Sequence, residues 1–87
     1  MVRVTLYTIP NCPECQAVKE FLEERGVAFQ ECDVAHNFGN LRQMRRLTPG
    51  RRVPVTALAG MVVVGFDPAA LLELIRKQEE ASHADGS

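Results

Sequence analysis

Apolar residues along this chain alternate between short β-branched runs and stretches with helical spacing. The short runs predict four strands, at residues 2–7, 27–34, 53–58 and 61–64. Apolar positions that recur every three or four residues predict three helices, at residues 13–25, 41–47 and 68–80. A right-handed crossover makes the first two strands parallel, and the tight Ala59-Gly60 turn makes the last two a hairpin. The order β-α-β-α-β-β-α therefore predicts an α/β fold, a four-stranded mixed sheet flanked by helices.

Capping residues mark the ends of the predicted helices. Pro13 stands early in the first helix, where its missing N–H costs little, and Gly26 follows that helix as a stop signal. Asp67 is expected to cap the last helix, with Pro68 as its first residue. The helical pattern fades near residue 80. We therefore expect one domain at residues 1–80 and a disordered tail at residues 81–87.

Composition narrows the class of protein. The chain has 87 residues, 46% hydrophobic and 24% charged, which is ordinary for one small globular domain. A net charge of −1 gives no reason to expect binding to nucleic acid or to an acidic membrane. No apolar run approaches the ~18–20 residues that span a bilayer, and the N-terminal residues lack the pattern of a signal peptide. We expect a cytoplasmic monomer.

The candidate chemistry lies in Cys12-Pro13-Glu14-Cys15, between the first predicted strand and the first predicted helix. A helix N-terminus carries unpaired N–H groups and the positive end of the dipole, a field that favours thiolate, the nucleophilic form, over thiol. Cys12 is the candidate nucleophile. Cys15, one turn further on and expected to lie deeper, is the candidate resolving thiol. This spacing predicts a dithiol/disulfide switch.

Other readings of the cysteines stay open. Three cysteines do not make the even set of a secreted disulfide framework, so a redox-active pair is favoured. Half of a zinc site is the alternative, but it needs two more ligands, and Cys32, His36 and His83 do not have a partnering spacing. Cys32 is expected to pack as a small buried hydrophobe, with a regulatory thiol or an intermolecular bridge as the alternatives.

These motifs together resemble the glutaredoxin branch of the thioredoxin fold, over about residues 2–78. Three segments carry the resemblance: an active-site segment, a cis-proline segment and a glycine-aspartate turn, namely Tyr7-Thr8-x-Pro10-x-Cys12-Pro13-x-Cys15, Val53-Pro54 and Gly65-x-Asp67. The resemblance implies a dithiol thiol–disulfide oxidoreductase that reduces protein or glutathione mixed disulfides. It also implies that no metal or organic cofactor is bound, with glutathione as a possible co-substrate.

The resemblance also implies a substrate-binding region. The Val53-Pro54 bond is expected to be cis and to face the cysteines, so that the Val53 main chain can bind a peptide-like substrate. Asp67 is expected to grip a polar end of glutathione, a role compatible with capping the last helix. The expected substrate-binding residues are Tyr7, Pro13, Arg52, Val53, Pro54, Gly65 and Asp67.

Half of the ten lysine and arginine residues lie within eleven positions, as Arg42, Arg45, Arg46, Arg51 and Arg52. They form either a solvated surface or a basic flank that steers an acidic partner or glutathione carboxylates. Arg52 is the best placed of them, because it adjoins Val53-Pro54.

Departures from the family pattern leave the electron source open. Ile9 stands where glutaredoxins usually have a lysine, and Glu14 where many have a tyrosine. An acid at that position is expected to weaken the binding of an anionic tripeptide. The Gly-Phe-Asp-Pro turn is similar to that of small redoxins that donate electrons to ribonucleotide reductase and often draw them from thioredoxin reductase. Val63 and Val64 stand where such redoxins often have tryptophan.

We therefore expect disulfide-containing proteins as partners, with glutathione or thioredoxin reductase as the electron source. Two further alternatives belong to other classes of protein. One is an iron–sulfur or metal carrier that uses Cys12 across a dimer, and the other is a catalytically silent interaction domain.

Overall fold

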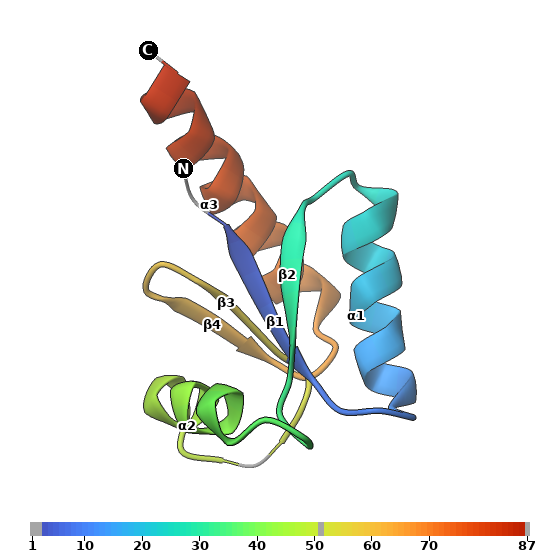
Figure 1. Cartoon of the computed structure of the whole chain (residues 1–87). Coiled ribbons are helices and arrows are strands. Elements are labelled where there is room, and N and C mark those ends of the chain that lie inside the picture. Colours follow the sequence, from blue (N-terminus) through green and yellow to red (C-terminus); the bar gives the residue numbers. More distant parts are fainter. Residues whose placement is uncertain (1–2, 51, 87) are drawn as a thin grey trace.

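The computed structural model describes residues 3–50 and 52–86, with side chains as far as residue 80. Its elements follow the predicted order (Figure 1): β1 (Val4–Thr8), α1 (Pro13–Glu24), β2 (Phe29–Asp33), α2 (Phe38–Leu47), β3 (Val55–Leu58), β4 (Met61–Val64) and α3 (Pro68–Gly86). The predicted β-α-β-α-β-β-α order is therefore confirmed.

The strands form one mixed sheet in the order β2-β1-β3-β4. β1 runs parallel to β2 and antiparallel to β3, and β3 pairs with β4 as the predicted hairpin. Gly60 in the hairpin turn has φ +85°, a left-handed conformation that glycine adopts without a steric penalty. The mixed four-stranded sheet is confirmed.

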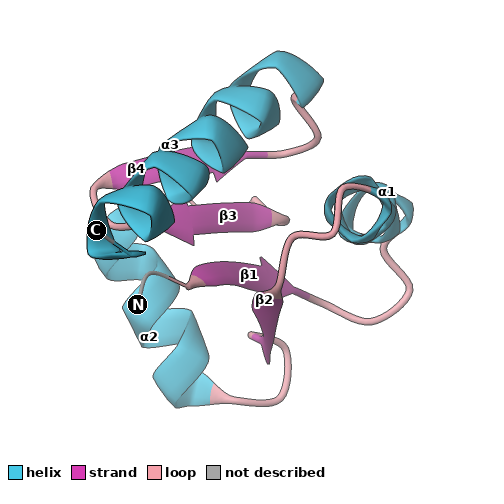
Figure 2. Cartoon of the chain, turned by 90° about the horizontal axis from the view of Figure 1, so that it is seen from above, coloured by secondary structure: helices cyan, strands magenta, loops and turns pink. Residues whose placement is uncertain are grey.

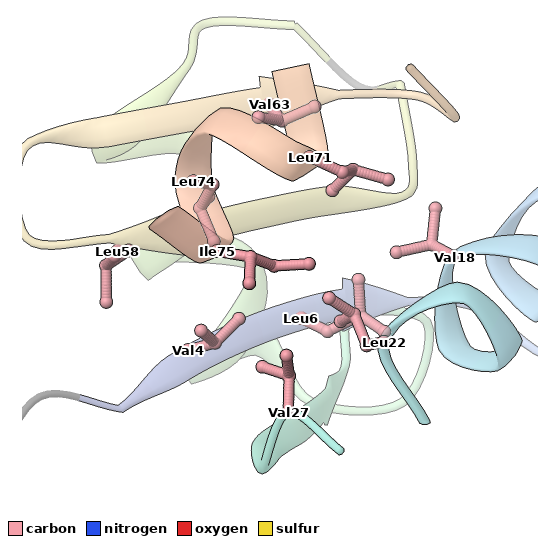
Figure 3. Close-up of a cluster of buried hydrophobic side chains, with 10 residues drawn as sticks. All are labelled: Val4, Leu6, Val18, Leu22, Val27, Leu58, Val63, Leu71, Leu74 and Ile75. Carbon is pink, nitrogen blue, oxygen red and sulfur yellow. The ribbon is translucent and has the colours of Figure 1, made fainter. Parts of the chain in front are cut away.

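Alternating residues of β1 face two separate hydrophobic clusters. Val4 and Leu6 face the larger cluster, where Val18 and Leu22 of α1 meet apolar residues of α3 (Figure 3). Tyr7 faces the smaller cluster, which contains Met44 of α2. The period-two alternation of a strand thus places α1 and α3 on one face of the sheet and α2 on the other, and Figure 2 shows α1 and α2 on opposite sides of β1.

Cys32 packs in the smaller cluster and is 8% exposed, which confirms its predicted burial. Burial, and then the neighbouring Glu31, raises the pKa of the Cys32 thiol. A buried thiol whose thiolate is disfavoured is a packing residue and a poor nucleophile.

Several element ends differ from the prediction. α2 begins at Phe38, three residues early, because the Asn37 side chain caps it by accepting the N–H of Asn40 at 3.0 Å. β2 and β3 are shorter than predicted. β2 matches the length over which it pairs with β1, and β3 matches the length over which it pairs with β4. Val2, placed in the first predicted strand, lies outside the described residues.

The last helix runs further than the sequence predicts. α3 extends to Gly86, whereas the helical pattern in the sequence fades near residue 80. The domain boundary at residue 80 stays a prediction. In the part of the chain that the structure describes, no helix combines the length and the apolar character needed to cross a membrane.

Candidate active site

The strand register brings the three segments that carry the candidate chemistry to one end of the sheet. Tyr7 near the end of β1 pairs with Val55 at the start of β3, and Val55 pairs with Val64 at the end of β4. The chain leaving β1, the chain entering β3 and the turn leaving β4 therefore lie at the same end (Figure 1). These are the segments that contain Cys12, Pro54 and Gly65.

Cys12 is the N-cap of α1. Its Sγ accepts the backbone N–H of Cys15 at 3.1 Å, and its carbonyl accepts the N–H of Gln16 at 3.0 Å. Asn11, directly before it, has φ +57°, a conformation that asparagine tolerates better than most residues. Cys12 is half-buried and its sulfur carries no disulfide, so a helix N–H points at a thiol that a partner can reach.

Cys15 differs sharply from Cys12 although it lies one turn away. It is 3% exposed and packs at the inner side of α1. Burial, and then a hydrogen bond with the Cys12 side chain, raises the pKa of the Cys15 thiol to about 11. The more exposed Cys12 is thus placed to attack first, and the shielded Cys15 to act second within the same molecule.

An open cleft of about 490 Å³ leads to the cysteines from the side of β2. Cys12 and Cys15 both line it, together with an ion pair between Lys19 and Glu31, whose nitrogen and oxygen are 3.2 Å apart. Thr8 also donates to Glu31, at 2.8 Å. No local sequence pattern indicates a role for Lys19 or Glu31, because their pairing depends on α1 packing beside β2.

The proline and glycine segments lie at the same end of the sheet as the cysteine motif. The Val53-Pro54 bond is cis, which confirms the prediction. The Pro54 carbonyl accepts the Gly65 N–H at 2.7 Å, so the two predicted segments contact each other directly. Gly65 has φ +78°, and a β-carbon there would lie 2.8 Å from an oxygen of Glu14. The positive φ favours glycine, and a larger residue would also have to displace the Glu14 side chain.

Glu14 joins the cysteine motif to the turn before α3. Its Oε2 accepts the backbone N–H of Phe66 at 2.8 Å and lies 3.4 Å from Nη2 of Arg52. The sequence predicts for Glu14 only a negative charge near the cysteines and does not indicate these partners. They stand 52 and 38 positions away in the chain, and no local pattern reveals such contacts.

Asp67 caps α3 as predicted. Its side chain accepts the N–H of Ala70 at 3.2 Å and its carbonyl accepts the N–H of Leu71 at 2.8 Å. Asp67 is exposed beside the Glu14–Phe66 contact. Its role in gripping glutathione stays a prediction.

The remaining predicted binding residues are spread over several surroundings. Tyr7 is 1% exposed in the smaller cluster, where burial raises its pKa, so its predicted substrate contact is not favoured. Pro13 is exposed at the first position of α1. Val53 is half-buried and lines a second groove, of about 370 Å³, with Ile9 and Arg45.

Of the basic residues, Arg45 thus lies beside the Val53 segment, and Arg52 contacts Glu14. Arg42 and Arg46 are exposed on α2, and Arg51 lies outside the described residues. The structure therefore brings two arginines to the candidate site.

No cluster of three or more His, Cys, Asp or Glu side chains within residues 3–50 and 52–86 could hold a metal ion. His36 lies on an exposed loop, far from the Cys12–Cys15 pair in sequence. Its Nδ1 lies 2.9 Å from Oδ2 of Asp33. The described cysteines and histidines therefore do not assemble a zinc site.

Comparison with known proteins agrees with this geometry. The glutaredoxin family model matches residues 4–63. An uncharacterized glutaredoxin-like 8.6 kDa protein in the rubredoxin operon of Clostridium pasteurianum is 34% identical over 74 residues, covering 85% of this chain and 99% of that protein.

Two solved structures have the same fold. A glutaredoxin from Archaeoglobus fulgidus superposes with a TM-score of 0.77 at 27% identity, covering 87% of this chain and 88% of that one. The glutaredoxin-like protein NrdH-redoxin from Escherichia coli, described as having a thioredoxin-like activity profile, superposes with a TM-score of 0.74 at 29% identity. It covers 83% of this chain and 93% of that one.

Fold and site together define a thioredoxin-like redoxin with a Cys-x-x-Cys pair at the N-terminus of its first helix. The chain belongs to the glutaredoxin family.

Proposed function

We propose that this protein is a dithiol thiol–disulfide oxidoreductase that reduces protein disulfides or glutathione mixed disulfides through Cys12 and Cys15. The observation that carries the proposal is the pairing of a half-buried Cys12, whose Sγ accepts a helix N–H at 3.1 Å, with a buried Cys15 one turn further on. An accessible first thiol and a shielded second one are what a two-step exchange requires.

In the first step the Cys12 thiolate attacks one sulfur of the target disulfide. A Cys12–target bond forms, the target S–S bond breaks, and the released target sulfur takes up a proton. Cys15 then loses its proton and attacks the Cys12 sulfur. The second target thiol leaves, and a Cys12–Cys15 disulfide remains, so the target gains two electrons and two protons from the dithiol. The second attack is intramolecular, which favours it over attack by free thiols.

The substrate is proposed to bind beside Val53 and Pro54. Within the described residues, neither the N–H nor the C=O of Val53 forms a hydrogen bond with the main chain of a turn, loop or helix cap. This supports the proposal that an extended peptide bonds to these two groups. Pro13, Arg52, Gly65 and Asp67 are the further proposed contacts. Disulfide-containing proteins are the proposed partners of a monomer in the cytoplasm, and the cycle needs no bound cofactor.

Two serine variants test the assignment. Cys12→Ser is expected to abolish disulfide reduction, because the accessible thiol is lost and the remaining cysteines are buried. Cys15→Ser is expected to abolish dithiol transfer and to leave monothiol exchange with glutathione, if glutathione is a substrate. Reduction of insulin disulfides and of a glutathione mixed disulfide would be measured for both variants. Full dithiol activity of Cys12→Ser would contradict the proposal.

A second candidate function is that of a redoxin that draws its electrons from thioredoxin reductase. It is supported by Glu14, whose carboxylate lies on the turn where glutathione was expected to bind, and by the similarity to NrdH-redoxin. The same preparation would be assayed with NADPH in two recycling systems, one containing glutathione and glutathione reductase, the other thioredoxin reductase. Turnover in the first system alone identifies glutathione as the reductant, and turnover in the second alone identifies the reductase.

A further inference from the structure

The turn that precedes α3 contains a binding position for a carboxylate, and the protein's own Glu14 occupies it. The Phe66 N–H donates to Glu14 Oε2 at 2.8 Å, and Nη2 of Arg52 lies 3.4 Å from the same oxygen. Gly65 leaves room for this approach because a β-carbon at that residue would lie only 2.8 Å from the oxygen. A backbone N–H and a guanidinium are strong carboxylate-binding groups.

This position lies within two residues of both cysteines in sequence, since Glu14 stands between them. It also adjoins the cis-proline segment, because the Gly65 N–H donates to the Pro54 carbonyl at 2.7 Å. A small thiol that enters the site and carries a carboxylate would therefore meet the Phe66 N–H and Arg52. It would find both groups already bonded to Glu14, and two carboxylates in one place repel each other.

We propose that Glu14 is a specificity-determining residue that acts as a built-in competitor for small thiols bearing a carboxylate, such as glutathione, and so favours protein disulfides. The proposal rests on the thiol–disulfide exchange proposed above, and it assigns the discrimination to one side chain. A protein disulfide needs no free carboxylate at this position, because it binds through its main chain. Glu14 thus penalises glutathione more than it penalises a protein substrate.

The prediction is a change in preference between thiols. In the Cys15→Ser protein, Cys12 forms mixed disulfides that mass spectrometry quantifies at equilibrium in a defined redox buffer. Glutathione would be compared with 2-mercaptoethanol, which has no carboxylate. Glu14→Ala, made in this background, empties the position and is expected to raise the preference for glutathione roughly tenfold, as for loss of a competing charged hydrogen bond that is partly exposed. Glu14→Gln keeps an acceptor but loses the charge, so its increase should be smaller.

Two further variants serve as controls. Glu20 is exposed on the same helix, six positions after Glu14, so Glu20→Ala removes one negative charge from α1 and leaves Glu14 in place. It should leave the preference unchanged. Arg52→Gln, added to Glu14→Ala, removes one of the vacated donors and should cancel most of the gain.

The outcomes separate this inference from the proposed function. An unchanged preference in Glu14→Ala, with adducts of both thiols still formed at Cys12, overturns the specificity role and leaves the exchange chemistry standing. If Glu14→Ala and Glu20→Ala raise the preference for glutathione equally, the specificity role is also overturned, because the effect would then come from the net charge of the protein. Failure of Cys12 to form an adduct with either thiol would overturn both proposals.

Discussion

Replacing Gly65 with alanine tests the contact between the cysteine motif and the turn before α3. The new β-carbon would lie 2.8 Å from Glu14 Oε2 and 3.0 Å from Nη2 of Arg52. Both atoms are the ends of flexible side chains, so they can move away. The expected consequence is that Glu14 gives up its hydrogen bond to Phe66 N–H.

The expected loss of stability has two parts. A non-glycine residue in the left-handed region, here at φ +78°, costs about 1–2 kcal/mol. A hydrogen bond to a charged group contributes about 1.5–3 kcal/mol, and we reduce this to about 1 kcal/mol because the Glu14 side chain is 38% exposed. Gly65→Ala should therefore lower the free energy of unfolding by about 2–3 kcal/mol.

Gly60→Ala is the matched control. Gly60 has φ +85°, and a β-carbon there would have no atom within 4 Å, so this variant reports the backbone cost alone. Urea unfolding of the reduced protein would be measured for both alanine variants, each with Glu14 intact and with Glu14→Ala. The cost of Gly65→Ala should fall by about 1 kcal/mol when Glu14 is absent. The cost of Gly60→Ala should stay the same.

Equal costs of Gly65→Ala in the two backgrounds would refute this reasoning. Such a result would mean that the β-carbon is accommodated without displacing Glu14. The competitor role of Glu14 would then need support from the thiol-preference experiment alone.

Two other predictions concern the second cysteine and the last helix. Burial is the largest cause of the raised pKa of Cys15, and it persists when Cys12 is held in a mixed disulfide, so Cys15 stays mostly protonated at neutral pH. Release of a target from the Cys12 mixed disulfide should therefore accelerate as the pH rises above 7; single-turnover quenched flow would measure it, and a flat profile would contradict it. Asp67→Ala should lower the free energy of unfolding by about 1 kcal/mol in urea, because the Ala70 N–H loses its partner, whereas Asp67→Asn should cost less. If Asp67 also binds glutathione, both Asp67 variants should raise the KM for glutathione in the recycling assay, and an unchanged KM would limit Asp67 to capping.

Much of the fold was predictable because its signals are local. Helical spacing in residues 13–25 and the β-branched run at residues 61–64 placed α1 and β4 within a residue of their observed ends. The start of α2 was predicted three residues too late. Asn37, Gly39 and Asn40 are each typical of turns and of helix caps, and the sequence does not show that Asn37 is the residue that caps the helix. Strand ends were missed for a different reason, since the extent of β2 follows its pairing with β1 and the extent of β3 follows its pairing with β4.

The sequence by itself determined the candidate chemistry, because a Cys-x-x-Cys pair at the start of a helix has the same meaning wherever the helix lies. It also determined the cap at Asp67 and the burial of Cys32, since both follow from short-range pattern. Only the tertiary structure decided which groups surround that pair. The Glu14 contact with Phe66, the close approach at Gly65 and the Lys19–Glu31 pair in the cleft join segments that are far apart in the chain. These contacts form because the sheet register and the packing of α1 bring the segments together. The local spacing of residues carries no information about which distant segments will meet.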